Sequence, residues 1–354
     1  AIVSVVDYTN TFQTNALTVA PNGSEKIGGI AAPNNLSTEG QSVTFVYVDG
    51  TEGWKNIQDS TSNVTGNPNL IATGGTITTC GNCKIHTFTG PGSFVVSSIS
   101  QTAPENIVSY MVVAGGGGQR GSGHYNGGGG AGGFREFKGP AQSYGVSPLN
   151  GSTPITVTAT SFPITVGAGG GANGSDSIFS TITSTGGGGG GSPGNGPGNT
   201  GGSGGGGSPF TPAGVQPGGA GNTPPVSPPQ GNPGGIGNVS SPPGRAAAGG
   251  GGGAGAVGGN SNTSNPITAG TGGAGVATSI SGSSVTRAGG GGGAAYAGTG
   301  GPGGSGGGGT GGNYPNSPAS SSGVVNTGGG GGGDAGFTSP TGGSGIVIIR
   351  YKFQ

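Results

Sequence analysis

Apolar and polar residues alternate over short runs in the first hundred residues, and turn-forming Gly, Asn or Asp residues separate the runs. Residues 2–6, 17–19 and 42–48 follow this pattern. A period of two places successive side chains on opposite faces of an extended strand. We therefore predict a small all-β module over residues 1–70. Because these few strands cannot enclose a core alone, we expect the native protein to continue upstream of Ala1.

A second group of apolar runs lies in residues 71–109. Residues 84–89 and 93–96 are β-prone and flank Gly90-Pro91-Gly92. A Gly-Pro-Gly segment between two such runs favours a hairpin. We therefore predict that residues 71–109 form a β-hairpin connector.

The only two cysteines, Cys80 and Cys83, flank Gly81-Asn82. This spacing favours a tight turn between two short strands, with the thiols reduced or disulfide-bonded. The alternative is a redox or metal role, but a closed zinc site needs four ligands and no full set is nearby.

From Tyr110 onward, short β-prone runs lead into tracts of four to six glycines. Their spacing is irregular, which excludes a strict solenoid, and there is no sustained Gly-X-Y period of the collagen type. The tracts are residues 115–118, 127–130, 186–191, 204–207, 249–253, 289–293, 306–309 and 328–333.

Composition sharpens the interpretation of these tracts. The chain has 96 Gly and 26 Pro among 354 residues, only 6% charged residues and a net charge of zero. Such a glycine content suggests low complexity, but disordered chains are usually highly charged. Ordering 96 glycines costs on the order of tens of kcal/mol more than ordering alanines, and burial of side chains cannot offset it.

Polyglycine II helices can offset this cost. They are extended, have three residues per turn and contain no internal hydrogen bonds, so their amides pair with neighbouring helices. Without Cβ atoms they pack closely on all flanks, which adds Cα–H···O contacts. We predict that residues 110–354 form a glycine-rich domain of packed polyglycine II helices with short β-strands. The whole chain should contain essentially no α-helix.

Two further segments have their own predictions. The proline-dense stretch 208–243 favours rim or loop segments between polyglycine helices, with a disordered loop as the alternative. Residues 346–351 form the strongest β-run, and we expect them to pair with residues 110–113 at the start of the glycine-rich region.

The sequence offers little for catalysis. No carboxylate occurs between Ser177 and Gly333, which excludes paired acids over most of the glycine-rich region. No basic excess is available for nucleic acid, and no apolar run has the roughly 20 residues that cross a bilayer. We expect no enzyme activity, no cofactor and no metal site.

The remaining candidates for a binding site are aromatic residues among the glycine tracts. One interpretation is that they cap the helices and exclude water from their ends. Alternatively, several stand on exposed loops, where aromatic rings offer large contact area at low entropic cost. Our candidate receptor-binding residues are Tyr125, Tyr296, Tyr314, Phe210 and His124.

Two parts of the chain resemble bacteriophage tail fibre proteins. The first part resembles a repeated tail-fibre module, and the second is similar to the glycine-rich domain of tail fibres. The first resemblance lies in residues 6–12, 15–19, 22–24, 36–38, 42–49 and 52–54. The second lies in residues 84–92, 112–115, 130–135, 164–169 and 343–351, and the proline-dense stretch departs from it.

The resemblance implies an adhesin that attaches a virion to the host bacterial surface. Its expected partners are a host cell-surface glycan or outer-membrane protein and other virion tail proteins, and fibre families imply a homotrimer. Its expected location is the extracellular tail fibre of the virion. The alternative is a structural glycine-rich protein that forms an extracellular fibril or matrix. A glycan depolymerase is disfavoured because it would need paired acids.

Overall fold

The computed structural model divides the chain into two compact units, Ala1–Pro68 and Asn69–Gln354. We call them the N-terminal module and the glycine-rich unit. The structure describes residues 1–60, 69–100, 102–121, 123–194, 196–209, 215–239, 246–264, 266–315, 319–336 and 338–353. Over these residues it is a β structure with one short 3-10 helix, Ala103–Asn106, and no α-helix, which confirms the predicted class.

The N-terminal module contains two small antiparallel sheets, of order β1-β4-β5 and β2-β3. Their bounds are β1 Ile2–Val6, β2 Leu17–Val19, β3 Asn34–Leu36, β4 Ser42–Asp49 and β5 Gly53–Asp59. The predicted runs are therefore strands. The fully buried part of the core is small and consists of Leu36, Val43 and Phe45.

The glycine-rich unit begins with two larger sheets, which we call the base. The inner sheet has the order β11-β10-β22-β8-β7, with β12 beside β10, and the outer sheet has the order β15-β14-β13-β9-β6. The inner strands are β7 Thr76–Cys80, β8 Cys83–Phe88, β10 Ile107–Val113, β11 Phe134–Phe137, β12 Ile155–Thr156 and β22 Ile346–Lys352. The outer strands are β6 Ile71–Thr73, β9 Gly92–Ser98, β13 Ser161–Thr165, β14 Ser177–Phe179 and β15 Ile182–Ser184.

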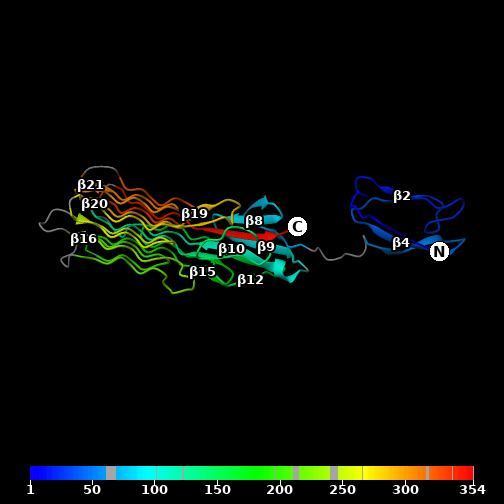
Figure 1. Ribbon diagram of the computed structural model, residues 1–354, viewed down its shortest axis with the longest axis horizontal. Coiled ribbons are helices and arrows are strands. Elements are labelled where there is room, and N and C mark those ends of the chain that lie inside the picture. The colour runs from blue at the N-terminus through cyan, green and yellow to red at the C-terminus, as the bar shows by residue number, and fades with distance from the viewer. Residues whose placement is uncertain are drawn as a thin grey trace. The chain divides into compact units, whose positions relative to one another are not determined.

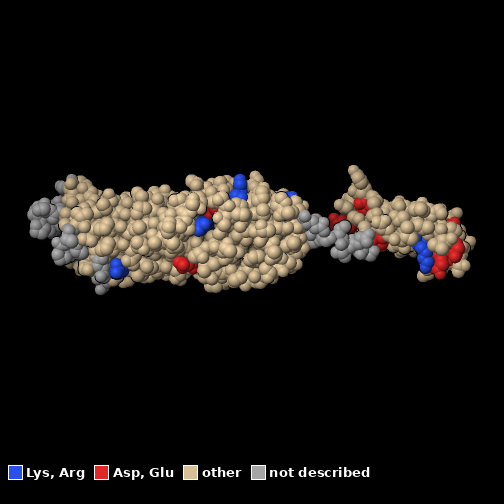
Figure 2. Space-filling model, turned by 90° about the horizontal axis from the view of Figure 1, so that it is seen from below, with Lys and Arg blue, Asp and Glu red and all other residues tan. Residues whose placement is uncertain are grey.

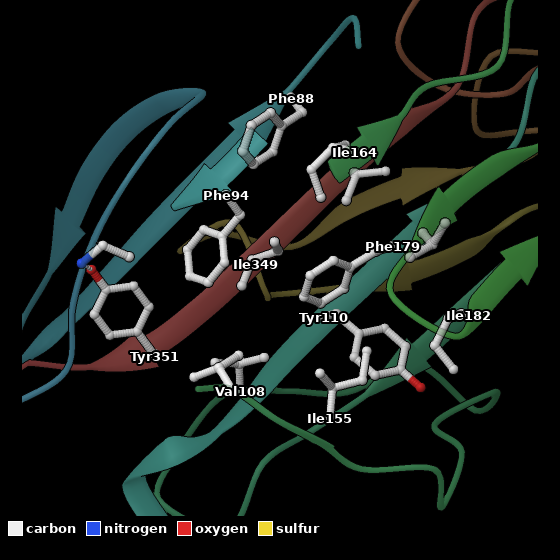
Figure 3. Packing of buried hydrophobic residues seen from close by; sticks show 14 of the residues in the cluster. Phe88, Phe94, Val108, Tyr110, Ile155, Ile164, Phe179, Ile182, Ile349 and Tyr351 are labelled. Atoms are coloured by element: carbon white, nitrogen blue, oxygen red, sulfur yellow. Dashed lines mark hydrogen bonds between the residues drawn. The ribbon is translucent and has the colours of Figure 1, made fainter. Parts of the chain in front are cut away.

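A dense side-chain core fills the space between these two sheets (Figure 3). Phe94 lies at its centre, with ring centroids 6.3 Å from Phe179 and 6.1 Å from Tyr351. The inner sheet is also buried on its other face, where Met111 and Ile348 pack with Ile280 beside the hairpin β18 (Val276–Thr278) and β19 (Val285–Arg287). Burial on both faces explains why residues 346–351 are almost continuously apolar.

Pairing of β22 with β10 is confirmed. The register places Tyr110 opposite Ile349 and Val113 opposite Ile346 in an antiparallel ladder. Strand β22, near the C-terminus, thus lies in the inner sheet between β10 and β8. The Cys turn is also confirmed, because Cys80 and Cys83 are opposite each other across Gly81-Asn82 and both thiols are free.

The predicted hairpin at Gly90-Pro91-Gly92 is wrong. β8 pairs with β7 and β22 in the inner sheet, whereas β9 pairs with β6 and β13 in the outer sheet. The segment is therefore a corner between two layers. The reason is that Phe88 and Phe94 enter the same core from opposite sheets, which buries more apolar surface than an isolated hairpin could. Residues 71–109 lie in the same compact unit as the glycine tracts, and they contain a hairpin, β7–β8, which turns at Gly81-Asn82.

Beyond the base, the glycine tracts run as extended, hydrogen-bonded chains to a small sheet at the other end of the unit (Figure 1). We call that end the tip. Its sheet has the order β16-β17-β20-β21. These strands are β16 Asn238–Val239, β17 Ala246–Ala247, β20 Ala295–Tyr296 and β21 Asn313–Tyr314.

The tract of residues 127–133, which we call the central tract, has the hydrogen bonding of a threefold helix. The amides of Gly127 and Gly130 both donate to the 186–191 tract, at 2.8 Å each. The amides of Gly128 and Ala131 donate to the 249–253 tract at 3.1 and 2.9 Å. The amides of Gly129 and Gly132 donate to the 328–333 tract, at 2.8 and 2.9 Å. Every third residue thus faces the same neighbour, as polyglycine II requires.

The carbonyls of the same tract reach three further neighbours. Gly128 and Ala131 accept from Gly206 and Ser203, and Gly129 accepts from Gly291. Gly130 accepts from Gly117. The central tract is therefore surrounded by six chain segments, three bonded through its N–H groups and three through its C=O groups. The glycine-rich unit therefore contains a bundle of packed polyglycine II helices, as predicted.

Close approach explains why these positions are glycine. A Cβ on Gly128 would overlap the backbone carbonyl of Gly291, and one on Gly129 would overlap the carbonyl of Gly117. These obstacles are backbone atoms of neighbouring tracts, so no side chain can swing away. The described part of the proline-dense stretch also joins the bundle: Gly219 donates to Gly205. It therefore contributes helices of its own, and not only the predicted rim.

Candidate functional site

Four of the predicted binding residues meet at the tip. Tyr296 and Tyr314 stack at 5.4 Å between ring centroids with an interplanar angle of 16°. Tyr125 meets Tyr296 edge-on at 5.4 Å, and His124 lies 4.5 Å from Tyr314. We call this group the tip cluster. Three segments far apart in the sequence contribute to it, so the sequence alone did not show that they converge.

The glycine bundle positions these rings. Tyr296 and Tyr314 are paired residues of the parallel strands β20 and β21, which places their side chains next to each other. Tyr125 has a φ of 87°, in the left-handed region that non-glycine residues seldom adopt. The next residue, Asn126, is fully buried, and its Nδ2 donates to Gln119 Oε1 at 2.9 Å and to the Gly123 carbonyl at 3.0 Å. These bonds fix the loop that carries His124 and Tyr125.

The cluster is partly open to solvent. His124 is exposed and the three tyrosines are half-buried. Burial raises the pKa of Tyr125 above its ordinary value, with smaller contributions from Tyr296 and Tyr314. The Tyr125 hydroxyl therefore stays protonated at neutral pH and can donate a hydrogen bond.

A polar hollow of about 610 Å³ lies beside the cluster. His124 lines it and donates from Nδ1 to the carbonyl of Ala335 at 2.8 Å, which leaves Nε2 as an acceptor while the ring is neutral. Asp334 lines it too, and its Oδ1 accepts from the Thr338 amide at 3.0 Å and from Ser320 Oγ at 3.2 Å. Gln119, Gly123, Gly336, Thr338 and Ser339 complete the lining.

This arrangement suits recognition of a molecule with one apolar face and several hydroxyls. Aromatic rings offer a stacking surface, and carboxylate, amide, imidazole and hydroxyl groups offer hydrogen bonds of both kinds. Within the described ranges, no group of three or more His, Cys, Asp or Glu side chains could hold a metal ion. Those ranges also include no helix with the length and apolar character to span a bilayer.

The fifth predicted residue, Phe210, lies outside the described residues. Sequence reasoning did not find Gln119, Asp334 and Thr338. Asp334 had a usable signal, because it is the first carboxylate after Asp176 and directly follows the 328–333 tract. A lone charged side chain at the end of an otherwise neutral tract is a candidate for a functional position, although Asp334 itself is only 4% exposed.

The glycine-rich unit thus contains a bundle of main-chain hydrogen bonds and carries, at one end, an aromatic site built from a loop and the strands β20 and β21. Charged side chains are sparse on the face of the unit that Figure 2 shows. Residues 89–352 match the family model of a glycine-rich domain, and the chain belongs to this family. No curated protein matches the chain.

Proposed function

We propose that this chain is the receptor-binding part of a bacteriophage tail fibre, an adhesin that attaches the virion to the host bacterial surface through the tip cluster. The observation that carries the proposal is the convergence of His124, Tyr125, Tyr296 and Tyr314 on one partly exposed site. That site lies at the end of the glycine-rich unit opposite to β22, near which the C-terminus lies (Figure 1).

Two further observations support this function. The sequence resembles tail-fibre modules both before and within the glycine-rich unit. The unit is also held by main-chain bonds, so side chains at the tip can differ without changing the bundle. The proposal has three further parts. The receptor is a glycan, and the chain has no enzymatic activity. The chain forms a homotrimer, which assembles with other virion tail proteins.

The test measures binding of the purified chain to a panel of bacterial strains. We expect Tyr125→Ala and Tyr296→Ala to lower binding to the recognised strain by at least about tenfold, because aromatic anchors often contribute about 2 kcal/mol or more. Tyr8→Ala is the matched control: Tyr8 is a tyrosine of the N-terminal module that is 90% exposed. Its substitution should leave binding unchanged.

Two results would contradict the proposal. One is equal binding to all strains by the parent chain and both tip variants. The other is spontaneous growth of the isolated chain into long filaments without strain preference, which the fibril or matrix alternative predicts.

A further inference from the structure

The base of the glycine-rich unit contains a second hollow, of about 340 Å³, away from the tip cluster. Gln142 and Ser143 line it from the loop after β11, and Arg350 and Lys352 line it from β22. Two cationic side chains and an amide therefore face one small space.

Arg350 is the unusual member of this group. Its side chain is 4% exposed, and no carboxylate among the described residues lies within ion-pairing distance of it. Its guanidinium donates to Gln142 Oε1 at 3.3 Å and to the carbonyls of Ser143 and Ile280 at 3.4 and 3.5 Å. All three bonds are longer than the usual 2.9–3.0 Å. The guanidinium also lies 5.1 Å from the ring centroid of Tyr144. A buried charge with long hydrogen bonds, one aromatic contact and no carboxylate partner is incompletely compensated.

The nearest carboxylates have other partners. Glu136 accepts from the Ser147 amide at 2.9 Å and from Thr278 Oγ1. Glu105 pairs with Lys352 at 2.7 Å. Among the described residues, neither acid forms an ion pair with Arg350.

Gln142 adds an unsatisfied donor. Because a guanidinium can only donate, its bond to Gln142 fixes Oε1 toward Arg350 and leaves Nε2 on the other side of the amide. Nε2 is buried without a hydrogen-bond partner, and the residue is 6% exposed. A single acceptor with several oxygens could satisfy both Nε2 and the free guanidinium hydrogens.

We propose that this hollow is a binding site for a small oxyanion, with Arg350 and Gln142 as its ligands and the Lys352–Glu105 ion pair at its edge. The bound group would be a carboxylate, sulfate or phosphate, since charge-assisted bonds from a guanidinium fork suit such oxygens. By neutralising Arg350, the anion would stabilise the packing of β22 on the loop of residues 140–143. This site is independent of the adhesin function.

The test is thermal unfolding of the intact chain in chloride buffer at fixed ionic strength, with sodium sulfate, phosphate or acetate added in separate series. We expect at least one anion to raise the unfolding temperature by roughly 2–5 °C and then saturate, because ligand binding to the native state alone stabilises it. Comparison of acetate with sulfate and phosphate distinguishes planar from tetrahedral ligands.

Two variants at one position make the test specific. Gln142→Glu places a carboxylate beside Arg350, so it should raise the unfolding temperature without added anion and abolish the anion response. Gln142→Leu should fold but lose the response. Arg120→Gln is the matched control: Arg120 bonds Asn199 in the tract region, and its loss should leave the response intact.

The proposal is overturned if the parent chain shows no saturable response, or if Gln142→Glu responds as strongly as the parent chain. It is also overturned if a crystal grown in saturating anion has only water in the hollow.

Discussion

The base and the polyglycine bundle belong to one unit but are stabilised in opposite ways. In the base, large side chains such as Phe94 and Tyr351 fill the space between two sheets. In the bundle, residues such as Gly129 have no side chain, and their amides and carbonyls bond to different neighbours. The first region gains stability from apolar burial, and the second from backbone pairing at a spacing that only glycine allows.

The two modes of stabilisation determine which substitutions each region tolerates. A packed side-chain core loses stability gradually when atoms are removed, because the neighbours relax in part. A bundle of bare backbones has nothing to remove, and any added atom meets a neighbouring carbonyl. The bundle should therefore be much more sensitive to enlargement than the base is to truncation.

The largest expected effect is Gly129→Ala. The new methyl group would overlap the carbonyl of Gly117, so that tracts must separate and lose their hydrogen bonds. We expect a loss of more than about 4 kcal/mol of unfolding free energy, or failure to fold. Chemical denaturation measures it. Gly171→Ala is the control, since a Cβ at Gly171 has no neighbour within 4 Å. Equal stabilities of the two variants would contradict the close-packed bundle.

The next effect is Phe94→Ala in the base. Phe94 is fully buried among aromatic rings, so its truncation leaves a cavity and should cost about 3–5 kcal/mol. The neighbouring Val95 is 39% exposed, and Val95→Ala should cost less than about 1 kcal/mol. A loss for Phe94→Ala no greater than that for Val95→Ala would show that the sheets do not share this core.

The smallest effect is the pH dependence of the base. His86 is buried and neutral: Nδ1 donates to the Gly74 carbonyl at 2.7 Å, and Nε2 accepts from the Tyr351 hydroxyl at 3.3 Å. Burial lowers the pKa of His86 below its ordinary value of 6.5. The unfolded chain therefore binds a proton first, and the stability from His86 is complete above pH 6.5 and declines as the pH falls below it.

Unfolding free energies between pH 5 and 8 measure this decline. His86→Gln, which cannot titrate, should flatten the profile over that range. A parent chain whose stability is the same at pH 5 and pH 8 would contradict the assignment of a neutral, buried imidazole.

The sequence predicts local structure well where one physical cause dominates. Residues 346–351, apolar except for Arg350, form the strongest β-run of the chain, and they pair with residues 110–113 as expected. The glycine tracts also favour one structure, because only pairing of backbone groups can offset the conformational entropy that glycine loses on ordering. The threefold bonding of the central tract agrees with it.

Prediction failed where the outcome depends on partners far away in the chain. Gly90-Pro91-Gly92 has the local signature of a hairpin between β8 and β9. Instead, β8 pairs with β22, which follows more than 250 residues later in the chain. Similarly, Tyr125, Tyr296 and Tyr314 were chosen one by one, and only the arrangement of the tracts brings them together. The polar hollow beside them could not be predicted, since Gln119 and Asp334 are separated by most of the domain.

The threefold repeat of the central tract has a consequence for how such domains can change in length. Each added residue turns the next amide by a third of a revolution, toward a different neighbour. Insertions of one or two residues inside a tract would therefore direct every later amide to the wrong partner. Insertion of a triplet keeps each amide facing its own neighbour and only lengthens the helix. Natural variation inside the tracts should occur in multiples of three, while the connecting loops vary freely.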